Sequence, residues 1–259
     1  MSTFLFDKIV FGPVRSRRLG VSLGINLLPT DSKVCSFDCI YCECGLNPKT
    51  REKKAELPSR EKVYSSLESK LQGMMEEGTP PDVITFAGNG EPTLHPDFDG
   101  IIDDTILLRD KYCTKARIAV LSNASRIQNQ KVFNALLKVE DNIQKLDSGL
   151  EKTIILLDKP NYNFNIEDTV ETLCRFDGKV IIQTMFVKGE YNGNRIDNTT
   201  KRDIEAWLKL LERIKPQSVM IYTIERDTPF DTLHKVPIEE LTGIAKLVEA
   251  IGIKTQVSG

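Results

Sequence analysis

The sequence contains few histidines, a single tryptophan and no long apolar segment. Its 259 residues include two histidines, and 35 Lys and Arg nearly balance 37 Asp and Glu, for a formal net charge of -2. No apolar run of about 18 residues is present to form a transmembrane helix, and the charged N-terminal stretch MSTFLFDKIVFGP is a poor secretory signal. We therefore expect a cytoplasmic protein without membrane contact, folded as one domain over residues 1–259 with short terminal extensions.

Several nucleotide-binding and hydrolase motifs are also missing. Neither G-x-G-x-x-G nor G-x4-G-K-[ST] occurs, which excludes the ordinary dinucleotide and P-loop sites. Neither His95 nor His234 accompanies a nucleophile motif, so a hydrolytic triad has no support, and we expect His95 to be a turn or N-cap residue. The near-neutral charge argues against extensive phosphate binding, although two basic clusters occur: Arg15, Arg17 and Arg18, and then Lys49, Arg51, Lys53 and Lys54.

Three of the six cysteines, Cys35, Cys39 and Cys42, are clustered with the spacing C-x3-C-x2-C. Thiolates are soft ligands that select zinc, copper(I) or iron–sulfur clusters. Four cysteines close a 4Fe–4S cube, whereas three leave one iron open to a small molecule. A structural zinc site with Cys44 as fourth ligand is the alternative, but no second C-x2-C pair or nearby histidine follows. The other cysteines are too scattered for a disulfide framework, which indicates a reducing compartment.

Strand-like and helix-like segments alternate along the chain, a pattern typical of a parallel sheet covered by helices. We predict strands at 19–28, 83–87, 117–121, 142–146, 180–187 and 218–224, with a short final strand at 253–257. The predicted helices cover 59–77, 96–110, 130–139, 168–176, 201–214 and 238–250. Six such units correspond to three quarters of an eightfold barrel, so the fold class is α/β, a partial (β/α)6 barrel.

The cysteine spacing, with Tyr41 directly before the third cysteine, resembles the motif of the radical S-adenosylmethionine enzymes. The resemblance implies a 4Fe–4S cluster on Cys35, Cys39 and Cys42 whose open iron chelates S-adenosylmethionine. It also implies one-electron cleavage to methionine and a 5'-deoxyadenosyl radical, with the electron supplied by a donor such as flavodoxin or ferredoxin. This chemistry belongs to the cofactors, and the protein contributes positioning and shielding.

A glycine motif, Gly88-Asn89-Gly90-Glu91-Pro92, directly follows the second predicted strand. It resembles the GGE motif of the same family, which implies that Gly90 allows close approach of the cofactor and that Glu91 meets its methionyl ammonium. Asn89 replaces the first glycine and is a residue that tolerates the left-handed region. Taken alone, the segment would be read as an ordinary turn between strand and helix.

Polar residues at the ends of later strands are further candidates for cofactor binding, since ligands of parallel sheets bind at the carboxyl edge. Ser122 and Asn123 end the third predicted strand, and Asp147 ends the fourth, where Lys145 shares its face because strand side chains alternate. Gln183 lies on the fifth predicted strand. The resemblance implies contacts of Asn123 or Asp147 with the ribose, and stacking of Tyr41 beside the adenine.

Over nearly the whole chain, segments such as FGPVRSRRLGVSLGINLLP, TFAGNGEPTLHPDF and GIKTQVSG resemble the radical proteins related to the wybutosine-synthesis enzyme of tRNA. This resemblance implies modification of a nucleoside in RNA, with the basic clusters contacting phosphates of tRNA. The cysteines of that enzyme's second cluster lie upstream of the first motif, and in this sequence no cysteine precedes Cys35, so the resemblance extends to the radical reaction but not to a second cluster and its pyruvate condensation. Two alternatives remain: modification or glycyl-radical activation of a protein or peptide, and a non-catalytic zinc or iron–sulfur module.

Overall fold

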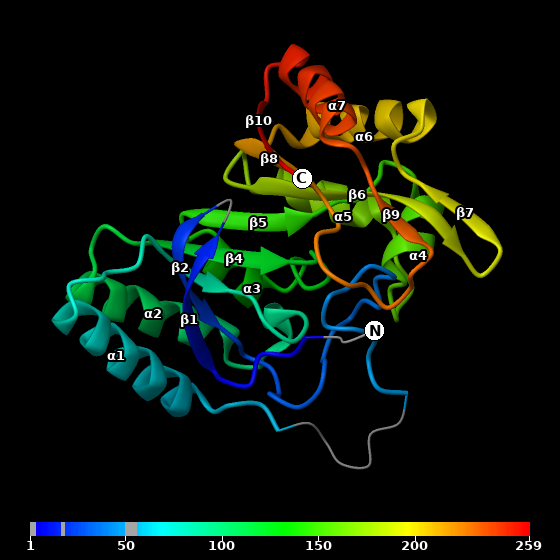
Figure 1. Cartoon of the computed structure of the whole chain (residues 1–259). Helices are drawn as coiled ribbons and strands as arrows, with labels where there is room; N and C mark the ends of the chain where they lie inside the picture. Colours follow the sequence, from blue (N-terminus) through cyan, green and yellow to red (C-terminus); the bar gives the residue numbers. More distant parts are fainter. Residues whose placement is uncertain (1–3, 17–18, 50–55) are drawn as a thin grey trace.

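One curved sheet forms the centre of the computed structural model, which describes residues 4–16, 19–49 and 56–259. Its main path runs in the order β1 (Val10–Ser16), β2 (Gly20–Ile25), β3 (Val83–Phe86), β4 (Arg117–Ser122), β5 (Asp141–Lys145), β6 (Ile181–Tyr191), β8 (Ser218–Thr223) and β10 (Lys254–Ser258). β1 is antiparallel to β2, and all later neighbours on this path are parallel. Figure 1 shows the sheet fanning from β1 and β2 toward β8 and β10.

Helices connect the parallel strands: α1 (Arg60–Glu76), α2 (Phe98–Tyr112), α3 (Gln130–Leu136), α4 (Glu151–Asp158), α5 (Ile166–Cys174), α6 (Lys201–Ile214) and α7 (Ile238–Ala250). Side-chain caps set several of their starts, as at Ser59, Asn165 and Thr200, whose oxygens accept backbone N–H groups of the first turn. One large core joins alternate strand residues such as Phe86 and Ile182 to the helices. The other strand face forms a separate small apolar cluster, which is the interior of the barrel.

The predicted partial (β/α)6 barrel is confirmed, with the predicted strands and helices present within a few residues. Five elements in the described residues were not predicted: β1, α4, a 3-10 helix at Pro92–Leu94, and the short strands β7 (Asn194–Asp197) and β9 (Leu233–Lys235). β1 contains Pro13, which an edge strand tolerates because its N–H groups need no ladder partner. β7 and β9 are short and extend β6 as an antiparallel ribbon, so tertiary pairing rather than local pattern creates them.

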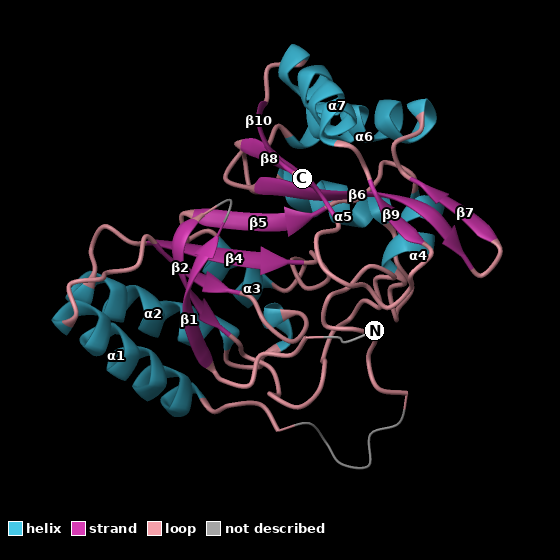
Figure 2. Cartoon of the chain, in the orientation of Figure 1, coloured by secondary structure: helices cyan, strands magenta, loops and turns pink. Residues whose placement is uncertain are grey.

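The loops that follow β2, β4 and β5 gather at the carboxyl edge of the sheet, beyond the arrowheads in Figure 2. This is the edge at which a parallel sheet binds its ligands. In the described ranges no helix is both long enough and apolar enough to cross a membrane.

Candidate functional site

The cysteine loop joins β2 to α1 and is tied by backbone hydrogen bonds to two other segments. Val34 bridges Gly90, with Val34 N donating to Asn89 O at 2.8 Å. On its other side Phe37 bridges Pro160, and Ile40 N donates to Leu157 O at 2.9 Å. The loop therefore lies between the glycine motif and the end of α4, at the carboxyl edge of the sheet.

Asn47 braces the cysteine loop from inside and was not predicted. Its Oδ1 accepts from Cys35 N at 2.9 Å, and its Nδ2 donates to Phe37 O at 3.2 Å and to Asp38 Oδ1 at 2.8 Å. Asn is a residue that commonly satisfies loop backbone groups, but nothing in the sequence states which groups lie within its reach. These bonds fix the backbone around the first cysteine.

The three thiols differ in their surroundings. Cys39 is buried, whereas Cys35 and Cys42 are partly exposed, and Cys35 Sγ accepts from Phe37 N and Asn123 Nδ2 at 3.4 Å each. Burial raises the pKa of Cys35 to about 12, while a hydrogen bond with Cys44 lowers that of Cys42 to about 6. Within the described residues no three His, Cys, Asp or Glu side chains converge on one metal position. A cube places its cysteines on different irons, so thiols spread along one loop fit such a cluster chemically.

Lys33 lies two residues before the first cysteine and is 2% exposed. Its ammonium donates to Gly45 O at 2.8 Å and lies 3.7 Å from Asp38 Oδ1. Burial lowers its pKa, but the three neighbouring cysteines and Asp38 raise it by more, so that the pKa is raised overall. A protonated ammonium is thus enclosed within the cysteine loop.

The glycine motif is not an open turn, because its backbone packs directly against the cysteine loop. Gly90 has φ +135°, and a Cβ there would lie 1.9 Å from Val34 O, so only glycine permits this approach of two backbones. Asn89, expected to tolerate the left-handed region, is not in it. Its buried side chain instead donates to Phe6 O at 2.9 Å and Pro29 O at 2.7 Å, and accepts from Phe6 N at 2.8 Å.

Glu91 is 2% exposed and already accepts several hydrogen bonds from the chain. Its carboxylate accepts from Thr93 N and Thr93 Oγ1, at 3.1 and 2.5 Å, and from Asn123 N at 2.6 Å. Burial raises the pKa of Glu91 despite these bonds. Ser122 Oγ accepts from Ala124 N at 3.1 Å, and Asn123 Nδ2 reaches Ser36 Oγ at 2.9 Å. The ends of β3 and β4 and the cysteine loop are thus joined through Glu91 and Asn123.

A second polar network lies at the end of β5. Lys145 Nζ contacts Tyr41 Oη and Asp147 Oδ2, and lies 3.2 Å from Asp158 Oδ1. Tyr41 Oη also lies within hydrogen-bond distance of both aspartates, at 3.0 Å from Asp158 Oδ1, and its single proton can go to either of them. Burial lowers the pKa of Lys145 but the two carboxylates raise it by more, whereas burial raises the pKa of Asp158 to about 8. Two buried carboxylates share one ammonium here, and the neighbouring charge of Asp147 adds to the effect of burial on the pKa of Asp158.

The predicted site residues therefore come together at one edge, in two groups. In the first group Asn123 contacts both Cys35 and Glu91, Ser122 directly precedes it, and Gly90 bridges the residue before Cys35. In the second group Asp147 shares a face with Lys145 as predicted. Tyr41 was expected to stack beside a base, but its hydroxyl is engaged with the aspartates and Lys145 lies over its ring at 4.6 Å. Gln183 pairs in register with Lys145 and is 7% exposed.

His95 is a turn residue as expected: its Nδ1 accepts from Asp97 N at 3.1 Å. Of the two basic clusters, Arg17, Arg18, Arg51, Lys53 and Lys54 lie outside the described residues.

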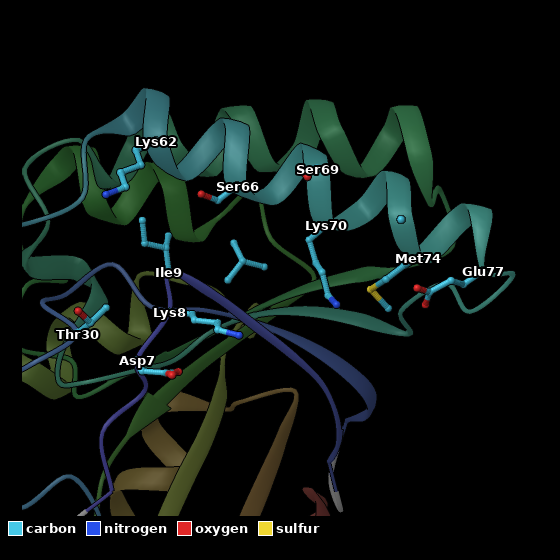
Figure 3. Close-up of a pocket in the computed structure, with 12 residues that line it drawn as sticks. Asp7, Lys8, Ile9, Thr30, Lys62, Ser66, Ser69, Lys70, Met74 and Glu77 are labelled. Atoms are coloured by element: carbon cyan, nitrogen blue, oxygen red, sulfur yellow. The ribbon is translucent and has the colours of Figure 1, made fainter.

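A separate groove of about 590 Å³ lies between α1 and β1 (Figure 3). It is lined by Lys8, Lys62 and Lys70 together with the hydroxyls of Thr30, Ser66 and Ser69, and by Asp7 and Glu77 near its ends. Asp7 and Thr30 directly follow Phe6 and Pro29, the two residues held by Asn89. The groove therefore begins close to the glycine motif.

Several solved structures share the fold. A radical SAM methyltransferase from Sphaerobacter thermophilus has a TM-score of 0.66 at 15% identity, over 92% of this chain and 65% of that one. TYW1 with a lysine–pyruvate adduct bound has a TM-score of 0.62 at 16% identity, over 88% and 73%. SuiB of Streptococcus suis bound to S-adenosylmethionine has a TM-score of 0.60 at 15% identity, over 92% and 47%. These similarities establish the radical SAM type of partial barrel.

No family model matches the chain, but curated proteins do. A protein of Brachyspira hyodysenteriae described as GTPase Obg is 31% identical over 250 residues, which are 95% of this chain and 34% of that protein. The chain thus spans about a third of that relative. A UPF0026 protein of Helicobacter pylori is 31% identical over 226 residues, which are 86% of this chain and 68% of that protein. The chain belongs to the family of UPF0026 proteins.

Proposed function

We propose that this protein is a radical S-adenosylmethionine enzyme that cleaves its cofactor reductively at a 4Fe–4S cluster and modifies a nucleoside in RNA. The observation that carries the first part is the placement of three cysteines in one braced loop at the carboxyl edge of a radical SAM type barrel. An electron donor such as flavodoxin or ferredoxin would serve this reaction.

In this proposal Cys35, Cys39 and Cys42 hold the cluster, which when bound supplies one electron to S-adenosylmethionine. Asn123 touches both Cys35 and Glu91, so it positions the cluster loop against the glycine motif. Glu91 would receive the ammonium of the cofactor by exchanging one of its present donors.

The interior of the barrel would hold the remainder of the cofactor. Lys145 and Asp147 lie together at the end of β5, where opposite charges suit a carboxylate and a ribose. On the next strand Gln183 is 7% exposed and pairs in register with Lys145, so its amide lies beside this pair. An amide both donates and accepts hydrogen bonds, which suits the polar groups of the cofactor.

The test of the first part is anaerobic reconstitution followed by assay of S-adenosylmethionine cleavage. We expect about four iron and four sulfide per chain, and slow formation of 5'-deoxyadenosine under reducing conditions. Replacing Cys35, Cys39 and Cys42 with Ala should abolish both, whereas the matched variant with Cys113 and Cys174 replaced should retain both. Cluster binding that survives the triple replacement would contradict the assignment, and zinc in place of iron would favour the interaction module.

The RNA substrate is supported by the resemblance to the wybutosine-related proteins and by the lysines of the groove in Figure 3. Lys8, Lys62 and Lys70 have no ion-pair partner among the described residues, so their charges are available to phosphates. The groove begins near the glycine motif, and a bound RNA strand could therefore continue toward the cluster edge.

Titration of the protein with bulk tRNA at low and moderate salt tests this second part. We expect salt-sensitive binding, since each phosphate contact releases a counterion. Changing Lys8, Lys62 and Lys70 to Gln should weaken binding and reduce its salt dependence, whereas changing the exposed Lys179, Lys246 and Lys254 to Gln should not. Absence of binding at low salt would instead favour a peptide or protein substrate.

A further inference from the structure

The cysteine loop contains a buried lysine, Lys33, to which the proposed function assigns no role. The Lys33 side chain is 1% exposed, and its ammonium holds the carbonyl of Gly45 at 2.8 Å. Gly45 N in turn donates to Cys42 O at 2.9 Å, so Lys33 is fixed to the backbone that carries the last cysteine. A lysine that is solvated at most sites is here enclosed in the loop that carries Cys35, Cys39 and Cys42.

Enclosing an ammonium costs free energy unless negative charge surrounds it. Asp38 supplies one carboxylate, but it stands 3.7 Å away and its Oδ1 is also bound by Asn47 N at 2.7 Å and by Asn47 Nδ2 at 2.8 Å. The Asp38 side chain is moreover 28% exposed, so water screens part of its charge. A buried ammonium in the loop that carries the cysteines is suited to lie beside an anionic group bound there.

We infer that the Lys33 ammonium is a fixed counter-charge for the cluster and raises its reduction potential. This inference rests on the proposed function. A cube held by three thiolates is anionic, and reduction adds one further negative charge. A positive charge held in a water-poor loop stabilises the reduced state more than the oxidised state, and the charge around a cluster is one of the factors that set its potential. Lys33 is therefore a tuning residue and does not touch the reacting atoms.

A purely structural role of Lys33 predicts a different effect of its replacement on the reduction potential. If Lys33 served only to hold Gly45 O, a neutral donor of similar reach would replace it without changing the potential. The variant Lys33→Gln removes the charge and keeps an amide donor, while Lys33→Arg keeps the charge. Lys246→Gln removes a charge from the exposed face of α7 and is the control for a change in net charge.

The experiment is a redox titration of the reconstituted proteins followed by electron paramagnetic resonance, with iron and sulfide measured for each. We expect Lys33→Gln to hold as much iron as the wild type but to have a more negative potential. At a fixed potential the ratio of reduced to oxidised cluster should fall at least tenfold, which is about 59 mV for one electron. Lys33→Arg and Lys246→Gln should stay near the wild-type potential.

Equal potentials in wild type and Lys33→Gln at full iron content would overturn the inference and leave the proposed function intact. A wild-type protein that assembles no cluster would overturn both. If Lys33→Gln assembles no cluster, Lys33→Arg decides: assembly with Arg supports a requirement for the charge, and failure of both variants assigns Lys33 a packing role and overturns the inference.

Discussion

Replacing Gly90 with Ala tests whether the glycine motif exists to seat the cysteine loop. The added Cβ would lie 1.9 Å from Val34 O and 2.5 Å from Val34 C, both backbone atoms that cannot rotate away. Gly90 also has φ +135°, where a side chain adds about 1–3 kcal/mol of strain. With a further cost of about 1–3 kcal/mol for the overlap, we expect the free energy of unfolding to fall by about 2–6 kcal/mol.

Denaturant titration of the protein without cofactors measures this loss, and Gly243→Ala provides the control. Gly243 lies in α7, and an added Cβ there meets no heavy atom within 4 Å, so this variant should gain about 0.5–1 kcal/mol. The Gly90→Ala variant should also take up less iron, because displacing Val34 moves the segment that leads into Cys35. A Gly90→Ala protein within about 0.5 kcal/mol of wild type would refute the reasoning.

Three further variants test other contacts. Asn89→Ala should lower the free energy of unfolding by about 2–4 kcal/mol in a denaturant titration, because it leaves the buried carbonyl of Pro29 without its donor, and an unchanged midpoint would contradict this role. Tyr41→Phe keeps the ring but removes the hydroxyl that joins the two aspartates, so we expect a loss of about 1–2 kcal/mol without loss of iron. Burial raises the pKa of Glu140, but hydrogen bonds from Ile118 N of β4 and from Arg109 outweigh burial, so the pKa is lowered overall. The ionised Glu140 carboxylate therefore stabilises the fold at neutral pH, and this contribution is lost as pH falls below about 4. Thermal unfolding of Glu140→Gln and wild type should therefore differ at pH 7 and converge near pH 3, and a constant difference would argue against the ion pair.

The local sequence pattern was sufficient to predict the alternating strands and helices of the barrel. The strands that became β3, β4 and β8 are apolar runs bounded by turn residues. α6 and α7 have the predicted limits because their start signals are local: Thr200 caps α6, and Pro237 directly precedes α7. The cysteine spacing and the glycine motif were likewise visible without coordinates. β1, β7 and β9 were not, because each gains its hydrogen bonds only from a neighbouring strand that local sequence does not identify.

By itself, the sequence determined which residues could bind a cluster and that they would follow parallel strands, since these depend on residue type and on the period of a strand. Only the tertiary structure decided what each candidate touches. Glu91 is bound by donors of its own chain, Tyr41 joins two aspartates, and Lys33 is enclosed beside the cysteines. The physical reason is that burial and hydrogen-bond partners arise from segments distant in sequence, and these determine the charge, the pKa and the availability of a side chain.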